Sequence, residues 1–223
     1  MASNKTAGRR RKVGFAFLLM FAPAFLLIFI SNRSCTHKFQ KLPDYGEVKQ
    51  YSFVDANGKT RSSKDFKGEI ILITTIQPTC PNDCAVSLSN LKLQIYKMLR
   101  GKKGIRIISF VTDANGEPLE DLSATQQMLE DEVLGYDPEI WILAKGDPSD
   151  VYDIQKGDRK LLDEIEKEGL GENGYQSLML LLDKQNHLRM IRSGKQEGMI
   201  RQMKQHIALL KKEYDQKEYN ETH

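Results

Sequence analysis

The stretch EIILITTIQPTCPNDCAVSL, from Glu69 to Leu88, joins an apolar run to two cysteines. Its first part, Glu69 to Gln77, is rich in β-branched residues, which is typical of a strand buried on both faces. Cys80 and Cys84 follow this strand directly. Beyond Cys84, apolar positions recur at helical spacing until Gly101, namely Leu88, Leu91, Ile95 and Met98. The stretch therefore predicts a strand, a dithiol and an amphipathic helix that begins at Cys84.

The neighbouring segments extend this unit into a larger domain. Before it, residues 51–63 alternate in polarity and turn at Asn57-Gly58, a strong hairpin signal. After it, the apolar runs Ile105 to Val111 and Glu139 to Ala144 predict two more buried strands. A helix-like stretch from about Leu119 to Leu134 separates them. Strands and helices that alternate in this way predict an α/β fold.

The last third of the chain adds a hairpin and a helix. Residues 175–193 contain two apolar runs and predict a hairpin that closes near 184–186. An amphipathic helix is predicted from Gln196 to Tyr214. Between the domain's third strand and the hairpin, residues 157–174 are charged and end rich in glycine, which indicates a surface excursion. We assign no chemistry to that excursion.

The N-terminus indicates a membrane anchor. Residues 1–12 hold five cationic side chains and no acid, and they lead into residues 13–30, which carry no charge. Eighteen helical residues cover about 27 Å, close to the thickness of the hydrocarbon core. A cleaved signal peptide is the alternative, because Ala22-Pro23-Ala24 supplies small residues, but the apolar run continues to Ile30. An uncleaved transmembrane helix over residues 13–30 is therefore expected.

The flanks of this segment predict its orientation. Cations before an apolar run favour the cytoplasmic side, which places the rest of the chain in the periplasm of a bacterium. Lipidation at Cys35 is disfavoured because the preceding residues 32–34 are polar and charged, so Cys35 is expected to be a juxtamembrane thiol. We expect a single-pass protein of the bacterial inner membrane with five parts: residues 1–12 (cytoplasmic), 13–30 (anchor), 31–42 (tether), 43–214 (folded domain) and 215–223 (polar tail).

The net charge excludes one class of partner. The formal charge of the whole chain is +3, but residues 31–223 carry 28 basic against 30 acidic residues once the five N-terminal cations are set aside. No nucleic-acid partner is therefore expected.

The two cysteines allow three kinds of chemistry. Residues i and i+4 near a helix start lie about 6 Å apart between Cα atoms, within the range of a disulfide. Amides at a helix N-terminus would favour the thiolate of Cys84, and of Cys80 if it is within reach. Two thiolates suit a redox switch or Cu(I). A purely structural disulfide would close only a short loop and stabilise little.

At this point the sequence resembles the Sco/SenC family of thioredoxin-fold copper chaperones. The resemblance covers about residues 43–212 and rests on TCPNDC after a buried strand, on the preceding FKG, on WILAKGD and on the terminal hairpin and helix. It implies an α/β, thioredoxin-like fold, here with an N-terminal hairpin and one N-terminal transmembrane helix. Members are typically anchored in the membrane. They assist assembly of the dinuclear copper site of cytochrome c oxidase, by binding copper or by reducing that site's cysteines.

The resemblance transfers some site residues and not others. Cys80 and Cys84 match the copper-binding and redox thiols, and Asp113 matches an acidic residue after the second strand. The family's third ligand, a histidine that opens the hairpin strand, does not transfer, because Tyr175 and Gln176 stand there. Phenol and amide oxygens are hard donors, poorly matched to Cu(I) beside two thiolates.

The four histidines offer no evident replacement for that ligand. His37 lies in the predicted tether, His187 at the hairpin turn, His206 on the final helix and His223 at the C-terminus. We expect none of them to bind a metal together with both cysteines, and His37 is the least unsuited.

Two functions follow from the sequence. In the favoured one, Cys80 and Cys84 act as the catalytic pair of a thiol-disulfide oxidoreductase, with either one attacking. In the alternative they bind Cu(I) with an unconventional third ligand or one from a partner. A peroxiredoxin-like peroxidase is disfavoured because Gln77 and Pro81, rather than threonine, stand three residues before the cysteines. The partners expected are the membrane, a cytochrome c oxidase subunit or another thiol or copper protein, and a periplasmic thiol reductant.

Overall fold

The structure is a computed structural model that describes residues 20–28, 41–79, 85–156, 159–160 and 174–222. The chain divides into two units, Met1–Gln40 and Lys41–His223, and each is described by itself. In the first unit, residues 20–28 are helical and their side chains are exposed. Among the described residues, no helix has both the length and the apolar character that crossing a bilayer needs. Half of the predicted anchor, residues 13–19 and 29–30, lies outside those residues, so the anchor stays a prediction.

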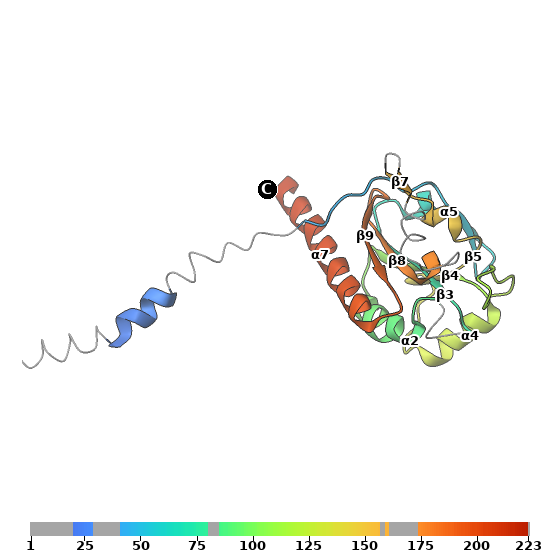
Figure 1. Cartoon of the computed structure of the whole chain (residues 1–223), viewed down its shortest axis with the longest axis horizontal. Coiled ribbons are helices and arrows are strands. Elements are labelled where there is room, and N and C mark those ends of the chain that lie inside the picture. The colour runs from blue at the N-terminus through green and yellow to red at the C-terminus, as the bar shows by residue number, and fades with distance from the viewer. Residues whose placement is uncertain (1–19, 29–40, 80–84, 157–158, 161–173, 223) are drawn as a thin grey trace, which may run out of the picture. The chain divides into compact units, whose positions relative to one another are not determined.

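The second unit is built on a seven-stranded mixed sheet (Figure 1). The strands lie in the order β2-β1-β5-β4-β3-β8-β9. The three central strands β3, β4 and β5 are parallel, whereas β8 and β1 join them antiparallel. Their bounds are β1 Ser52–Asp55, β2 Thr60–Ser62, β3 Ile70–Ile76, β4 Ile105–Val111, β5 Trp141–Lys145, β8 Leu178–Leu182 and β9 Leu188–Ser193. The four strands β4-β3-β8-β9, with a parallel pair beside an antiparallel hairpin, form the thioredoxin-like arrangement that the sequence predicted.

Helices of different lengths connect these strands. Between β3 and β4 the chain forms three consecutive helical pieces, of which the middle one, η2, has the wider π-helical turn. The bounds are η1 Ser63–Phe66, α2 Leu88–Asn90, η2 Leu91–Tyr96, α3 Lys97–Leu99, α4 Ser123–Glu132, α5 Ser149–Tyr152, η3 Gly174–Ser177 and α7 Glu197–Thr222. In Figure 1, α7 runs beside the β8–β9 hairpin, and it packs against both β9 and η2.

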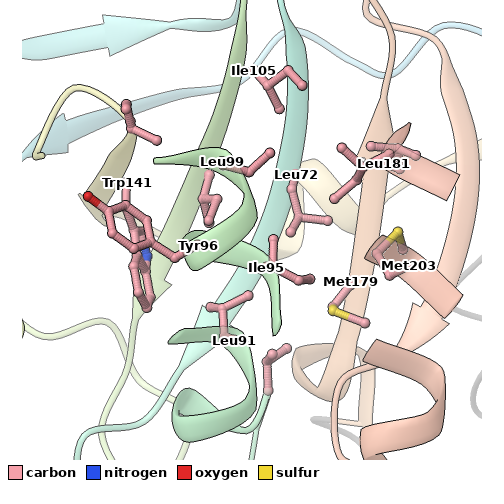
Figure 2. Close-up of a cluster of buried hydrophobic side chains, with 14 of the residues drawn as sticks. Leu72, Leu91, Ile95, Tyr96, Leu99, Ile105, Trp141, Met179, Leu181 and Met203 are labelled. Carbon is pink, nitrogen blue, oxygen red and sulfur yellow. The ribbon is translucent and has the colours of Figure 1, made fainter. Parts of the chain in front are cut away.

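The sheet separates two hydrophobic layers, because successive strand residues point to opposite faces. All seven residues of β3 are buried, as expected for a strand covered on both sides. One layer lies under α2, η2, α3, α4 and α7, and Figure 2 shows part of it, with Tyr96 and Trp141 side by side at a ring-centroid distance of 5.4 Å. The other layer is covered by shorter pieces, namely the segment before β1, η1 and α5.

Several predicted elements are confirmed with small shifts. The hairpin at Asn57-Gly58 joins β1 to β2, and Gly58 has the positive φ of 78° that such a turn favours. The final helix is longer than predicted, since it continues from Tyr214 to Thr222. Ion pairs such as Lys211–Asp215 support the extra turns at i, i+4 spacing. Of the predicted surface excursion, residues 157–174, the structure describes only β7 Arg159–Lys160 and Gly174, where η3 begins. The strand β7 pairs antiparallel with β6 Gln155–Lys156, which lies just before the excursion.

Candidate functional site

The candidate site lies at the carboxyl end of β3, where the sequence placed the dithiol. The strand ends at Ile76, and Gln77 follows it as a buried residue. Cys80 and Cys84, like Cys35, fall outside the described residues. The residues on either side of the pair define the surroundings of the site.

The chain is held to the sheet where it resumes after the cysteines. The amide of Val86 donates to the carbonyl of Thr75 on β3 at 3.1 Å, and the amide of Ser87 donates to the carbonyl of Gly194 at 2.9 Å. Both amides therefore already donate to carbonyls at or next to the ends of strands. Ser87 also has a non-helical ψ of 108°. The helix begins at Leu88, so the prediction that it begins at Cys84 is wrong. Cys84 therefore does not stand at the start of the helix, the position from which helix amides were expected to favour its thiolate.

Gly194 allows the segment of Val86 and Ser87 to lie close to the end of β9, because it has no side chain. A Cβ atom placed on Gly194 would lie 2.5 Å from one γ-methyl group of Val86 and 2.7 Å from the other. The Gly194 amide also donates to the carbonyl of Ser177 at 2.6 Å. Gly194 thus joins the end of η3 to the segment that follows the cysteines, and a side chain there would push that segment away.

Gln176 is the centre of a buried polar cluster at the same end of the sheet. It is only 1% exposed. Its Oε1 accepts from Gln77 Nε2 and from Thr112 Oγ1, each at 3.3 Å, and its Nε2 donates to the carbonyl of Gly116 at 2.8 Å. The side-chain amide of Gln176 therefore links the ends of β3 and β4 to the loop that follows β4. Gln77 Oε1 is buried and has no hydrogen-bond partner among the described atoms.

Tyr175 faces a different environment from its neighbour. It is half-buried against the second hydrophobic layer, with its ring centroid 5.2 Å from that of Tyr152. Burial raises the pKa of the Tyr175 phenol, which keeps it protonated at neutral pH. A neutral phenol is a poor ligand for Cu(I).

The predicted strand from Tyr175 to Asp183 starts later than expected. Tyr175 and Gln176 belong to η3, a 3-10 turn, and β8 begins at Leu178. The Ser177 hydroxyl donates to the carbonyl of Gly174 at 2.8 Å, which closes this turn locally instead of extending the ladder. The turn nevertheless packs against β3, so both residues lie at the end of the sheet from which Cys80 follows.

Asp113 organises a turn beside this cluster. Its Oδ1 accepts from the amides of Asn115 at 2.8 Å and Glu117 at 2.9 Å. These hydrogen bonds, that from Glu117 foremost, lower the pKa of the Asp113 carboxyl. The turn includes Gly116, whose carbonyl accepts from Gln176. In this structure the acidic residue after the second strand therefore shapes the loop that holds Gln176.

The described histidines lie away from this end of the sheet or on the final helix. His187 sits at the β8–β9 turn, as predicted, with Nδ1 3.0 Å from Asp44 Oδ2. His206 lies on α7, and burial lowers its pKa. His37 and His223 fall outside the described residues. Within the described ranges, which do not contain the three cysteines, no cluster of three or more His, Asp or Glu side chains could hold a metal ion.

The comparisons with known proteins agree with the fold and motif. The family model described as SCO1/SenC matches residues 40–211. The chain belongs to the SCO1/SenC family. No curated protein matches it.

Solved structures of SCO1/SenC proteins are among its structural neighbours. A SCO1/SenC family lipoprotein from Bacillus anthracis is 19% identical to this chain, with a TM-score of 0.46. The match covers 74% of this chain and 98% of the lipoprotein. BsSco, described as having a disulfide switch and as a member of the Sco family of cytochrome c oxidase assembly proteins, is 20% identical, with coverages of 74% and 95% and a TM-score of 0.47. The thioredoxin domain of a thiol-disulfide oxidoreductase from Bacteroides vulgatus is 17% identical, with coverages of 68% and 89% and a TM-score of 0.38.

Sequence reasoning missed three residues that shape the site, namely Gln77, Thr112 and Gly194. Each follows directly after a strand, at the carboxyl end of β3, β4 or β9. That position is the available signal, because strand ends in an open α/β sheet gather at a common edge. Their pairing with Gln176 and Val86 depends on strand order, which local patterns do not contain.

Proposed function

We propose that this SCO1/SenC protein acts by thiol-disulfide exchange through Cys80 and Cys84. The proposal rests on the hydrogen bonds that the side-chain amide of Gln176 forms. Tyr175 and Gln176 stand at the family's usual ligand position and both are hard donors. The Gln176 side chain is buried and hydrogen-bonded to Gln77, Thr112 and Gly116. With no soft donor at that position, two thiols that follow a buried strand are better suited to redox exchange than to a three-ligand copper site.

The exchange proceeds in two steps that conserve atoms and electrons. One cysteine thiolate attacks a sulfur of the client's disulfide, forms a mixed disulfide and releases one client thiolate. The second cysteine then attacks the mixed disulfide, which forms the Cys80–Cys84 disulfide and releases the second client thiol. Two electrons pass to the client. A thiol reductant in the periplasm returns the pair to the dithiol.

The proposed location follows from the first thirty residues. The cluster of cations at residues 9–12 and the uncharged residues 13–30 support a single anchor in the bacterial inner membrane, with the folded unit in the periplasm. Exposed apolar side chains at residues 20–28 are consistent with a lipid environment, because water would disfavour them. The proposed client is the copper-site subunit of cytochrome c oxidase, which the family membership supports.

Copper binding is the alternative, and metal analysis separates the two functions. Full-length protein purified under reducing conditions is analysed for copper and assayed for reduction of a disulfide substrate. We expect little bound copper, together with catalysed reduction that Cys80→Ser or Cys84→Ser abolishes. Stoichiometric copper that is lost in Cys80→Ser, without catalysed reduction, would instead support a Cu(I) chaperone that recruits a ligand from elsewhere.

A further inference from the structure

A cavity of about 530 Å³ lies at the opposite end of the sheet from the candidate site. Ile71 contributes to its lining from the amino end of β3, and Asp183 to His187 contribute from the β8–β9 turn. The candidate site follows the carboxyl end of β3, after Ile76. A volume in this range is that of an ordinary small-molecule site.

Among the described residues, only short pieces of chain lie over the second hydrophobic layer at this end. The cover there consists of η1 and the segment before β1. Tyr51, Phe66 and Ile71 supply buried apolar surface to the lining. The floor of the cavity is therefore suited to a flat or aliphatic apolar group.

The rim of the cavity carries excess positive charge. Lys64 and Lys67 are exposed, line the cavity and form no ion pair within the described part of the chain. Of the acidic lining residues, Asp183 is neutralised by Arg189 at 3.0 Å, which leaves Glu47. Lysine ammonium groups beside an apolar floor favour a ligand with one anionic end.

Tyr51 adds a buried aromatic ring to this lining. Its side chain is buried, and its hydroxyl has no partner among the described atoms. Burial raises the pKa of Tyr51, so its hydroxyl stays protonated and adds no negative charge to the lining.

We propose that this cavity is a binding site for a small amphipathic carboxylate, with its apolar part against Phe66 and Ile71 and its carboxylate near Lys64 and Lys67. The site is independent of the exchange proposed for Cys80 and Cys84. Its ligand class follows from the lining alone, which combines cationic and apolar groups.

The test uses 4-fluorobenzoate as the probe. The full-length protein in a non-ionic detergent is titrated and followed by fluorine NMR. We expect saturable binding with a Kd on the order of 0.1 to 1 mM for about ten non-hydrogen atoms. Lys67→Glu should weaken binding about tenfold, because it replaces an attractive charge by a repulsive one. The neutral analogue 4-fluorobenzyl alcohol should bind more weakly than the carboxylate.

Two matched variants keep the result interpretable. Lys97→Glu changes an equally exposed lysine on α3, which covers the opposite layer, and should leave the Kd unchanged. Tyr51→Phe retains the ring, removes only a buried hydroxyl without a partner among the described atoms, and should leave both the Kd and the melting temperature little changed. Absence of saturation up to about 10 mM, or equal affinity in the Lys67→Glu and native proteins, would overturn the proposal. Equal weakening by Lys97→Glu would do so too, because it would indicate nonspecific charge attraction.

Discussion

Gln77 and Gln176, separated by 99 positions in the sequence, meet through a hydrogen bond of 3.3 Å between their buried side-chain amides. Gln77 stands three residues before Cys80, and Gln176 is one of the two residues, with Tyr175, that stand where the resemblance to the family predicts a metal ligand. The contact means that a change at position 176 acts on the end of β3 as well as on any ligand set. The two residues available for introducing histidine are therefore not equivalent.

Introducing histidine at position 175 should raise Cu(I) affinity at a smaller cost than at position 176. Gln176→His removes hydrogen bonds to Gln77, Thr112 and Gly116, and we expect a loss of about 1–3 kcal/mol in the free energy of unfolding. Tyr175→His changes a half-buried ring and should cost less. In both variants a preplaced nitrogen donor should strengthen Cu(I) binding relative to the native dithiol.

A competition titration with a chromogenic Cu(I) chelator measures these affinities, and urea unfolding measures the stabilities. Native protein that holds Cu(I) as tightly as the better histidine variant would contradict the prediction. It would reveal another ligand and favour the chaperone function.

Substitution of Gly194 should destabilise the protein through Val86. The added methyl group in Gly194→Ala would lie 2.5–2.8 Å from Val86 side-chain atoms, and overpacking of this kind costs about 1–3 kcal/mol. Val86→Ala removes the two nearest of these atoms. The double variant should therefore be more stable than the sum of the two single changes predicts.

The matched control for this change is Gly198→Ala, measured by the same chemical denaturation. A Cβ atom on Gly198 meets nothing within 4 Å, and the residue lies in α7. Alanine there should stabilise the protein by about 0.5 kcal/mol. A Gly194→Ala protein as stable as Gly198→Ala would show that the close approach to Val86 has no energetic consequence.

Loss of Arg189 should be among the most damaging single changes. Its guanidinium is buried between Asp183 and Glu213, at 3.0 Å from each. It also donates to the carbonyls of Leu42 and Pro43 at 2.9 Å. Arg189→Met leaves Asp183 and Glu213 without the buried cation that they share, with only Lys217 Nζ remaining 3.4 Å from Glu213 Oε1, and breaking a buried network of this kind typically costs about 3–5 kcal/mol.

A second change and a surface control test this explanation by urea unfolding. Arg189→Met combined with Glu213→Gln should be less destabilised than Arg189→Met alone, because one of the two buried carboxylates that lost Arg189 no longer carries a charge. Arg201→Met breaks an exposed pair with Glu197 and should change stability by less than about 0.5 kcal/mol. Equal effects of Arg189→Met and Arg201→Met would refute the buried-network explanation.

The Asp44–His187 pair should make stability depend on pH near neutrality. The hydrogen bond with Asp44 raises the pKa of His187 above its usual value of about 6.5. The contribution of the pair is therefore complete below about pH 6.5 and is lost as pH rises through the raised value. The melting temperature of native protein, relative to that of Asp44→Asn, should be higher at about pH 6 than at about pH 8. The same difference at both pH values would contradict this assignment.

A reporter fusion tests the predicted membrane topology. The cations at residues 9–12 precede the uncharged residues 13–30, which predicts a cytoplasmic N-terminus. Alkaline phosphatase joined after residue 223 should therefore be active in cells, because it folds only outside the cytoplasm. The control replaces the cations at residues 9–11 by acidic residues and should lower the activity. An inactive fusion to the native sequence would reverse the orientation.

Much of the fold follows from local patterns along the chain. The uniformly buried run of β3, the identical bounds predicted for β4 and the turn at Asn57-Gly58 all follow from residue periodicity and turn chemistry. The family follows from a motif, TCPNDC, in the setting of a buried strand and a terminal hairpin. These features are local because each depends on residues that are near one another in the sequence.

Contacts between segments that are distant in the sequence determined the remaining features of the fold and of the candidate site. The helix after the cysteines begins at Leu88 rather than Cys84 because the amides of Val86 and Ser87 bond to Thr75 and Gly194 instead. Gln176 is buried at the end of β3 because β8 pairs with β3, a strand order that no local pattern encodes. The sequence alone identified the two thiols and the missing histidine. Only the tertiary structure decided which buried amide stands in that place and what it holds together, because those hydrogen bonds join residues brought close by strand pairing.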